Sequence, residues 1–142
     1  MIERVVFDTS SLASAAIKAG AKPNRALMYA LGFCTACASE QLIAELREVI
    51  SRQRFDRYLS YPEKQKFLDL VQENFKIFPV VTSDIENVDP PCRDPEDNFV
   101  LALALIAKAD AIVSSDHDLL TLHPWRGIAI LTPAQFLEQI TH

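Results

Sequence analysis

The feature that most restricts the fold of this chain is a regular alternation of short apolar segments with longer amphipathic ones. The segments at residues 5–7, 111–113 and 128–131 contain no polar side chain. Segments this short and this apolar are typical of strands that are buried on both faces of a parallel sheet. We therefore predict an α/β fold, a three-layer α/β/α sandwich whose central, mostly parallel sheet has about five strands.

Two further strands are expected at residues 33–37 and 77–81, with a polar loop at 84–91. The intervening segments have the apolar spacing of helices, which we expect at residues 10–17, 24–31, 39–52, 62–75, 95–107 and after Thr132 and Pro133. In the helix at 95–107, Asp94 is the expected N-cap and Pro95 the first helical residue. Because residues 99–107 are apolar nearly all round, this helix should be central.

Length and composition favour a single domain over residues 1–142, because 142 residues with 49% hydrophobic side chains can bury a core without disulfides or metals. The net charge of -5 argues against a broadly basic surface for non-specific nucleic-acid binding. The sequence shows no signal peptide and no apolar run long enough to cross a bilayer, so we expect a cytoplasmic protein with no membrane partner.

Basic residues are concentrated in one stretch of the chain despite the negative net charge. This stretch is either a solvated helical surface or a local patch that binds a charged partner. Its members are Arg47, Arg52, Arg54, Arg57, Lys64 and Lys66.

Two acidic residues directly follow predicted strands. Asp8 comes after residues 5–7, and Asp116 comes shortly after residues 111–113. In open parallel sheets, ligands bind beyond the carboxyl ends of the strands, where both of these side chains should lie. Asp118 follows two residues after Asp116 and is a further candidate.

Two more acids are expected at the same edge. Glu45 falls roughly 40° beyond Val49 on its helix at 100° per residue, which places it on the rim of the buried face. Asp97 lies at the start of the central helix. Each acid also has a structural interpretation: Asp8 as a turn residue, Glu45 as a salt-bridge partner, Asp97 with Asp94 as caps, and Asp116 as an N-cap.

Carboxylates gathered at one edge repel one another unless a cation lies between them. Oxygen ligands favour Mg²⁺ or Mn²⁺ over zinc, and such ions are suited to phosphodiester hydrolysis. Other chemistries lack their motifs: with only three glycines, the chain has no G-x-G-x-x-G, P-loop or G-x-S-x-G sequence. A metal-dependent phosphatase would need an Asp-x-Asp start, whereas position 10 is Ser10.

Three cysteines are too few for a disulfide framework. Cys34 and Cys37 form a C-x-x-C sequence, which suggests a redox or zinc pair. No second Cys or His pair completes a structural zinc site, and a buried strand running into a helix cap is the alternative for this segment.

Four segments of the chain resemble motifs of the PIN-domain nucleases. They are Val5-Val6-Phe7-Asp8-Thr9-Ser10, Ser39-Glu40-Gln41-Leu42-Ile43-Ala44-Glu45-Leu46, Cys92-Arg93-Asp94-Pro95-Glu96-Asp97-Asn98 and Ser114-Ser115-Asp116-His117-Asp118-Leu119-Leu120. The resemblance spans nearly the whole chain and is greatest to VapC-type ribonucleases, the toxins of toxin-antitoxin pairs. Ser10 stands where the family more often has Asn.

The resemblance implies a PIN-like fold and endoribonuclease activity that depends on Mg²⁺ or Mn²⁺. It implies an RNA substrate, a cognate antitoxin and a homodimer as partners. It also implies that Asp8, Glu45, Asp97 and Asp116 are catalytic and hold the metal, with Asp118 as a fifth ligand. Ser10 and Ser114 are expected to support them, Ser114 by positioning the last acid. The alternative is a PIN-like scaffold or regulatory binding module.

Overall fold

The computed structural model describes residues 1–140 and contains a five-stranded, wholly parallel sheet. Its order is β3-β2-β1-β4-β5, with β1 in the middle. The strands are β1 (Arg4–Phe7), β2 (Thr35–Ala38), β3 (Lys76–Ile77), β4 (Ala111–Val113) and β5 (Ala129–Leu131). The predicted fold class is confirmed. Residues 141 and 142 of the expected single domain lie outside the described residues.

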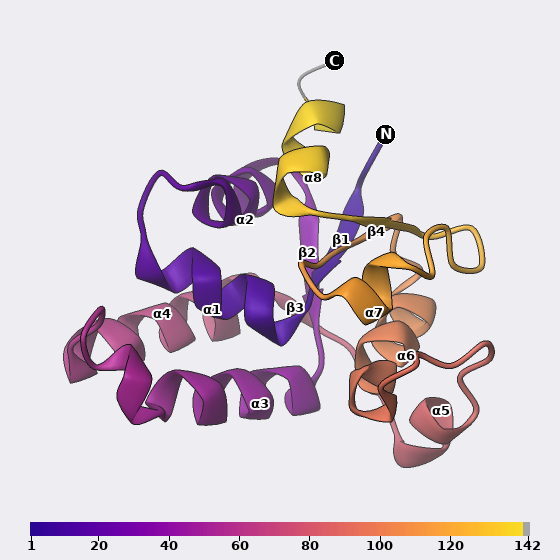
Figure 1. Ribbon diagram of the computed structural model, residues 1–142, viewed down its shortest axis with the longest axis horizontal. Coiled ribbons are helices and arrows are strands. Elements are labelled where there is room, and N and C mark those ends of the chain that lie inside the picture. The colour runs from indigo at the N-terminus through magenta and orange to yellow at the C-terminus, as the bar shows by residue number, and fades with distance from the viewer. Residues whose placement is uncertain (141–142) are drawn as a thin grey trace.

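Helices cover both faces of this sheet (Figure 1). The α-helices are α1 (Thr9–Ile17), α2 (Lys22–Phe33), α3 (Glu40–Ser51), α4 (Tyr61–Asn74), α5 (Thr82–Glu86), α6 (Asn98–Ala107), α7 (His117–Leu120) and α8 (Pro133–Ile140). Two short 3₁₀ helices, η1 (Gln53–Phe55) and η2 (Pro95–Asp97), lie before α4 and α6. None of the described helices is long and apolar enough to cross a bilayer.

The strand order explains how the helices are divided between the faces. From β1 the chain moves outward to β2 and β3, then returns past β1 to β4 and β5. Because parallel crossovers are right-handed, reversing the direction of travel moves the connecting helices to the opposite face. Figure 1 accordingly shows α1 and α2 on one side of the sheet and α5 and α6 on the other.

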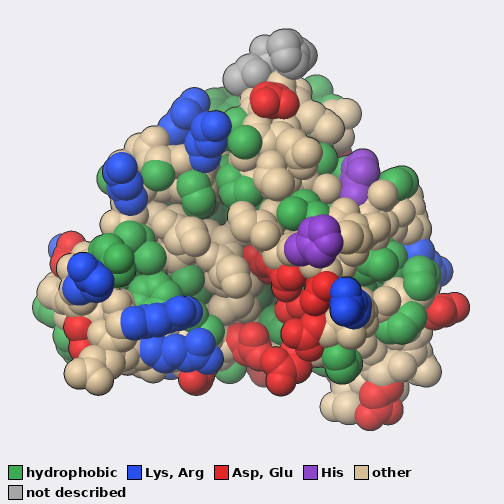
Figure 2. All heavy atoms as spheres, in the orientation of Figure 1, with side chains coloured by type: hydrophobic (Ala, Val, Ile, Leu, Met, Phe, Trp, Pro, Cys, Tyr) green, Lys and Arg blue, Asp and Glu red, His purple; other side chains and the backbone are tan. Residues whose placement is uncertain are grey.

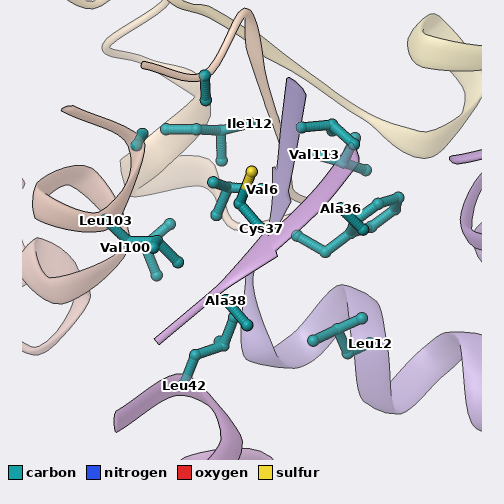
Figure 3. Packing of buried hydrophobic residues seen from close by; sticks show 14 of the residues in the cluster. Val6, Leu12, Ala36, Cys37, Ala38, Leu42, Val100, Leu103, Ile112 and Val113 are labelled. Atoms are coloured by element: carbon teal, nitrogen blue, oxygen red, sulfur yellow. The ribbon is translucent and has the colours of Figure 1, made fainter. Parts of the chain in front are cut away.

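The core lies on both sides of β1 and β4, as expected for strands without polar side chains. Val6 of β1 and Ile112 of β4 are fully buried. Figure 3 shows Val100 and Leu103 of α6 on one side of these strands and Leu12 of α1 on the other. The expectation of a central, nearly all-apolar helix is confirmed, since most of α6 is buried.

Three predicted boundaries differ from the structure for identifiable reasons. The strand expected at 77–81 ends at Ile77, because Pro79 has no N–H for the ladder. Helix α2 continues to Phe33, whose ring stacks on Tyr29 one turn earlier at 4.8 Å between centroids, so β2 begins at Thr35. The expected loop at 84–91 begins within the short helix α5.

The start of the central helix also differs from the prediction. Residues 95–97 form the 3₁₀ helix η2, and the α-helix begins at Asn98. Asp94 is the N-cap of η2, as its side chain accepts a hydrogen bond from the Glu96 backbone N–H at 3.0 Å. Asp97 therefore lies at a junction between two helices.

Candidate functional site

Asp8 follows β1 at the carboxyl edge of the sheet and is almost fully buried. Its Oδ1 accepts a hydrogen bond from the Ser11 backbone N–H at 2.9 Å, which caps α1. Its Oδ2 accepts a hydrogen bond from the Ser114 hydroxyl at 2.6 Å. Burial raises the pKa of Asp8, although the hydrogen bonds from Ser114 and Ser11 oppose the rise. The side chain is held in one orientation by two elements.

Ser114 connects Asp8 to Asp116. It follows β4, which pairs with β1, and it is fully buried. While its hydroxyl donates to Asp8, its Oγ accepts a hydrogen bond from the Asp116 backbone N–H at 2.9 Å. Asp116 in turn caps α7, because its Oδ1 accepts from the Asp118 N–H at 2.9 Å. The N-cap role considered for Asp116 is therefore present alongside its clustering, and Asp8 is a helix N-cap where a turn residue was considered.

Asp97 brings a third carboxylate to this edge. Its Oδ2 is buried and has no hydrogen-bond partner among residues 1–140. Burial raises the pKa of Asp97 to about 7, assisted by a hydrogen bond shared with the Asp116 carboxyl group and by the charges of Asp94 and Asp8. Asp97 and Asp116 are therefore close neighbours, and the negative charge of Asp116 disfavours ionisation of Asp97.

Glu45 reaches the same region from α3 and is half-buried, as the rim position predicted. The Thr9 hydroxyl donates to its Oε2 at 3.5 Å. Burial raises the pKa of Glu45; the Thr9 bond opposes this rise, and the Glu96 carboxylate adds to it. Thr9 and Glu96 were not expected to influence Glu45. The signal for them in the sequence is that they are direct neighbours of Asp8 and Asp97.

The acids surround a hollow of about 150 Å³, which we call the acid hollow. Its lining includes Asp8, Ser10, Glu45, Asp97, Arg52 and Arg54. Acidic side chains gather at the centre of this face, with basic ones to their left in the view (Figure 2). Asp116 and Asp118 do not line the hollow. Burial raises the pKa of Cys92, and the charges of Asp97, Asp116 and Asp118 raise it further, so these three acids lie near the same thiol.

The acid edge has the donor chemistry of a divalent-cation site but is not a closed ligand set. Within residues 1–140, no three His, Cys, Asp or Glu side chains are grouped so that they could hold an ion as they stand. The available donors are nevertheless all carboxylate oxygens, and the Asp97 Oδ2 has no other partner there. Mg²⁺ and Mn²⁺ prefer such oxygens and retain waters that span longer distances. The residues therefore fit either ion.

The sequence model of the PIN domain matches residues 4–118. The chain belongs to the PIN domain family. This match covers three of the four motifs on which the predicted resemblance depended and the fourth as far as Asp118, and it confirms the predicted family. No curated protein sequence matches the chain significantly.

Solved structures share this PIN fold at low sequence identity. PAE2754 from Pyrobaculum aerophilum has a TM-score of 0.67 and 15% identity, covering 99% of this chain and 97% of its own. VapBC2 from Rickettsia felis, bound to a promoter DNA fragment, has a TM-score of 0.60 and 14% identity, covering 89% and 96%. VapC20 from Mycobacterium tuberculosis, a sarcin-ricin loop cleaving toxin, has a TM-score of 0.58 and 12% identity, covering 88% of this chain and 98% of its own.

The basic stretch of this PIN domain divides between two places. Arg52 and Arg54 line the acid hollow, and Arg52 also pairs with Glu48 at 2.9 Å on the helix surface. Arg47 instead lines a separate pocket with Lys64, which forms an ion pair with Asp56 at 2.6 Å. Only part of the basic stretch therefore adjoins the acids.

The cysteines of this PIN domain are free thiols. Cys34 donates to the Ile2 carbonyl oxygen at 3.3 Å, and Cys37 is buried in β2. Burial raises the pKa of both thiols. A low thiolate content makes a cysteine unreactive, so the half-buried Cys34 and the buried Cys37 have the character of packing residues.

Proposed function

We propose that the protein is an endoribonuclease that depends on Mg²⁺ or Mn²⁺ and hydrolyses RNA phosphodiester bonds as the toxin of a toxin-antitoxin pair. The observation that carries this proposal is the convergence of Asp8, Glu45, Asp97 and Asp116 from four segments of the chain. Burial, together with the nearby carboxyl groups of Asp116, Asp94 and Asp8, raises the pKa of Asp97 to about 7. Membership of the PIN domain family supports nuclease chemistry at this edge.

The proposed ligands are Asp8, Asp97 and Asp116, bound directly or through water. Glu45 is a further ligand or orients the attacking water, and Asp118 belongs to a second, weaker metal position. When bound, the ion would neutralise negative charge on the phosphodiester and make water a nucleophile at neutral pH.

The side chains around these acids have defined roles in the proposal. Ser114 fixes Asp8 and the Asp116 backbone relative to each other through its two hydrogen bonds. Thr9, which directly follows Asp8 in the sequence, donates a hydrogen bond to Glu45 and so holds that side chain near Asp8. Ser10 lines the acid hollow and offers a hydroxyl where the family more often has an amide. These contacts set the carboxylates in place before substrate arrives, which favours catalysis.

The proposed substrate and partner follow from what is said of two structural neighbours. VapC20 is described as a toxin that cleaves the sarcin-ricin loop, and VapBC2 was solved on promoter DNA. We propose by analogy an RNA substrate, a cognate antitoxin, a homodimeric state and a cytoplasmic location. Sequencing the reading frame next to this gene tests the antitoxin.

Cleavage of a mixed RNA pool tests the enzymatic proposal. The purified protein should cleave RNA with Mg²⁺ or Mn²⁺ and not with EDTA. Asp97→Asn should abolish cleavage, because it removes a charge from the acid edge, whereas Ser115→Ala, at an exposed residue outside the hollow, should cleave like the wild type. Cleavage that persists in EDTA, or in Asp97→Asn, would exclude this mechanism.

A scaffold is the second candidate, and one observation favours it. The acids of residues 1–140 do not form a ready-made metal group. A scaffold would bind its partner equally well with and without divalent ions, and would show no heat of metal binding in calorimetry. The acids themselves favour the nuclease, because a scaffold has no need to keep mutually repelling carboxylates at one edge.

A further inference from the structure

A second, larger groove adjoins the acid hollow. It has a volume of about 490 Å³ and lies between α1 and the segment around η1. Ser10, Val49 and Arg54 line both this groove and the acid hollow. The two form one continuous surface, and a chain-like ligand held at the acids would extend along it. We call this second part the Arg-Tyr groove, after Arg54, Arg57 and Tyr58, which line it.

The Arg-Tyr groove carries two guanidinium groups that form no ion pair within residues 1–140. The ion pairs formed among residues 1–140 are Arg52 with Glu48 and Lys64 with Asp56. Arg54 and Arg57 are exposed and take part in neither pair. On a protein with a net charge of -5, these two guanidinium groups are a local attraction for phosphates.

An aromatic ring is exposed beside these charges. The Tyr58 side chain is 51% exposed, and the Arg57 guanidinium carbon lies 5.4 Å from its ring centroid. Exposed hydroxyl groups of Ser10 and Ser14 line the opposite, α1 side of the groove. A cationic groove with an aromatic ring is the combination by which proteins bind single-stranded nucleic acid, through phosphates and stacked bases.

We propose that the Arg-Tyr groove binds the single-stranded RNA segment adjacent to the cleaved phosphate, with a base stacked on Tyr58 and its flanking phosphates on Arg54 and Arg57. This inference rests on the proposed ribonuclease function. A base in a duplex has both faces covered by its neighbours, so Tyr58 selects for an unpaired one. The groove volume lies within the roughly 300 to 1,000 Å³ of sites that enclose small ligands, enough for a nucleotide.

Binding of fluorescein-labelled RNA in EDTA tests this assignment in the full-length protein without cleavage. Tyr58→Ala should weaken the binding of a short single-stranded RNA about 5- to 10-fold, the lower end of the effect of losing one stacked base, and Tyr58→Phe should not. The same RNA annealed to its complement should bind more weakly to the wild type. Tyr58→Ala should not change that weaker affinity.

Charge reversal tests the phosphate binding, with a matched control on the same stretch. Arg57→Glu should weaken the binding of single-stranded RNA and lower the salt dependence, log Kd against log salt, by about 0.7 for each phosphate that the variant no longer binds. Arg47→Glu makes the same change of net charge in a separate pocket and should leave both quantities unchanged. Equal effects from the two variants would mean a general field effect and would overturn the assignment.

A scan with abasic nucleotides locates the stacked base. Removing one base at a time around the cleavage position should reproduce the Tyr58→Ala loss at one position. At that position, combining the abasic RNA with Tyr58→Ala should cause no further loss. A penalty from Tyr58→Ala that is the same with every abasic RNA would contradict stacking.

The outcomes separate this inference from the proposed function. A wild-type protein that neither cleaves nor binds RNA would remove both. A wild-type protein that cleaves RNA, with Tyr58→Ala and Arg57→Glu binding RNA as it does, would remove only the groove assignment. If those two variants instead lose binding to the protein encoded beside this gene while RNA affinity is unchanged, the groove is a protein-docking surface and the assignment is wrong.

Discussion

Ser114 connects two of the acids at the site through hydrogen bonds of a single hydroxyl group. Its hydroxyl donates to Asp8 and accepts from the Asp116 backbone N–H, so one small side chain fixes acids that are more than a hundred residues apart in the sequence. It is also completely buried, and water cannot replace either bond. The geometry of the acid edge therefore depends on a residue that does not line the acid hollow.

Ser114→Ala should lower the free energy of unfolding by about 1 to 3 kcal/mol, because it leaves the buried Asp8 Oδ2 without its donor. The Asp116 N–H also loses its acceptor, and cleavage should fall because both acids become less ordered. Urea denaturation and initial cleavage rates measure the two effects. The exposed neighbour Ser115→Ala is the control, and a Ser114→Ala variant as stable and active as this control would contradict the positioning role.

The raised pKa of Asp97 determines how the stability of the protein changes with pH. Because the folded-state pKa is about 7 and the ordinary value is 3.8, the folded protein binds more protons than the unfolded chain between these values. Without metal, the contribution of Asp97 to the free energy of unfolding should therefore be fully present below about pH 3.8 and be lost as pH rises through about 7.

Asp97→Asn should remove much of this loss. Without metal, the melting temperature of the variant should exceed that of the wild type by more at about pH 8 than at about pH 5, since only the wild type acquires the extra charge. Differential scanning fluorimetry in EDTA measures both proteins at each pH. Melting curves that shift in parallel, or a variant much less stable at both values, would show that Asp97 is a structural cap.

Helix α3 brings the two sides of the acid hollow together at the level of elements. It contacts α1 on one side and α6 on the other, and it carries Glu45 between them. The hollow is the space that these three helices leave at the carboxyl edge. Any change in the position of α6 therefore moves Asp97, directly before its first residue, relative to Glu45.

A cavity in α6 tests how firmly this element is held. Leu101→Ala should lower the free energy of unfolding by about 2 to 5 kcal/mol, because Leu101 is fully buried. Ile106→Ala, on the exposed side of the same helix, should cost much less. Chemical denaturation compares the two, and a small, equal cost at both positions would contradict the central packing of α6.

The whole molecule is expected to respond to divalent ions. Mg²⁺ or Mn²⁺ at about 100 times its Kd should stabilise the fold by about 2.7 kcal/mol, because only the folded chain assembles the carboxylates. Ca²⁺, which accepts looser geometry, should stabilise the protein without supporting cleavage. Thermal melts with each ion, repeated with Asp97→Asn, measure this effect. Equal stabilisation of wild type and variant would place the bound ions elsewhere.

The sequence was informative where a structural rule connects distant residues. Strands without polar side chains predicted the parallel sheet, and that sheet predicted Asp8 and Asp116 at one edge. The hydrogen bond from Thr9 to Glu45 and the effect of the Glu96 charge on the pKa of Glu45 depend on the tertiary arrangement of α1, α3 and η2, which no local pattern encodes. Asp118 lies in the first turn of α7, where its backbone N–H donates to the Asp116 Oδ1 at 2.9 Å, and its side chain does not line the acid hollow.

Some boundaries differ from the prediction because contacts one helical turn apart outweigh the composition of the segment. The chain at Phe33 has strand-like composition, yet stacking on Tyr29 and the hydrogen bond from the Cys34 N–H to Ala30 keep α2 helical to that residue. Pro79 gave a local signal that a strand would end, and the two-residue β3 obeys it.

The pairing of β1 with β4 also has a consequence for how the protein is made. Asp8 leaves the ribosome about a hundred residues before Val113, whose carbonyl oxygen accepts a hydrogen bond from the Asp8 N–H, and before the supporting Ser114. At a synthesis rate of roughly 5 to 20 residues per second, the nascent chain spends seconds without an assembled acid edge. The acid edge therefore assembles only after the segment that carries Ser114 has been synthesised, and no earlier stretch of the nascent chain can complete it.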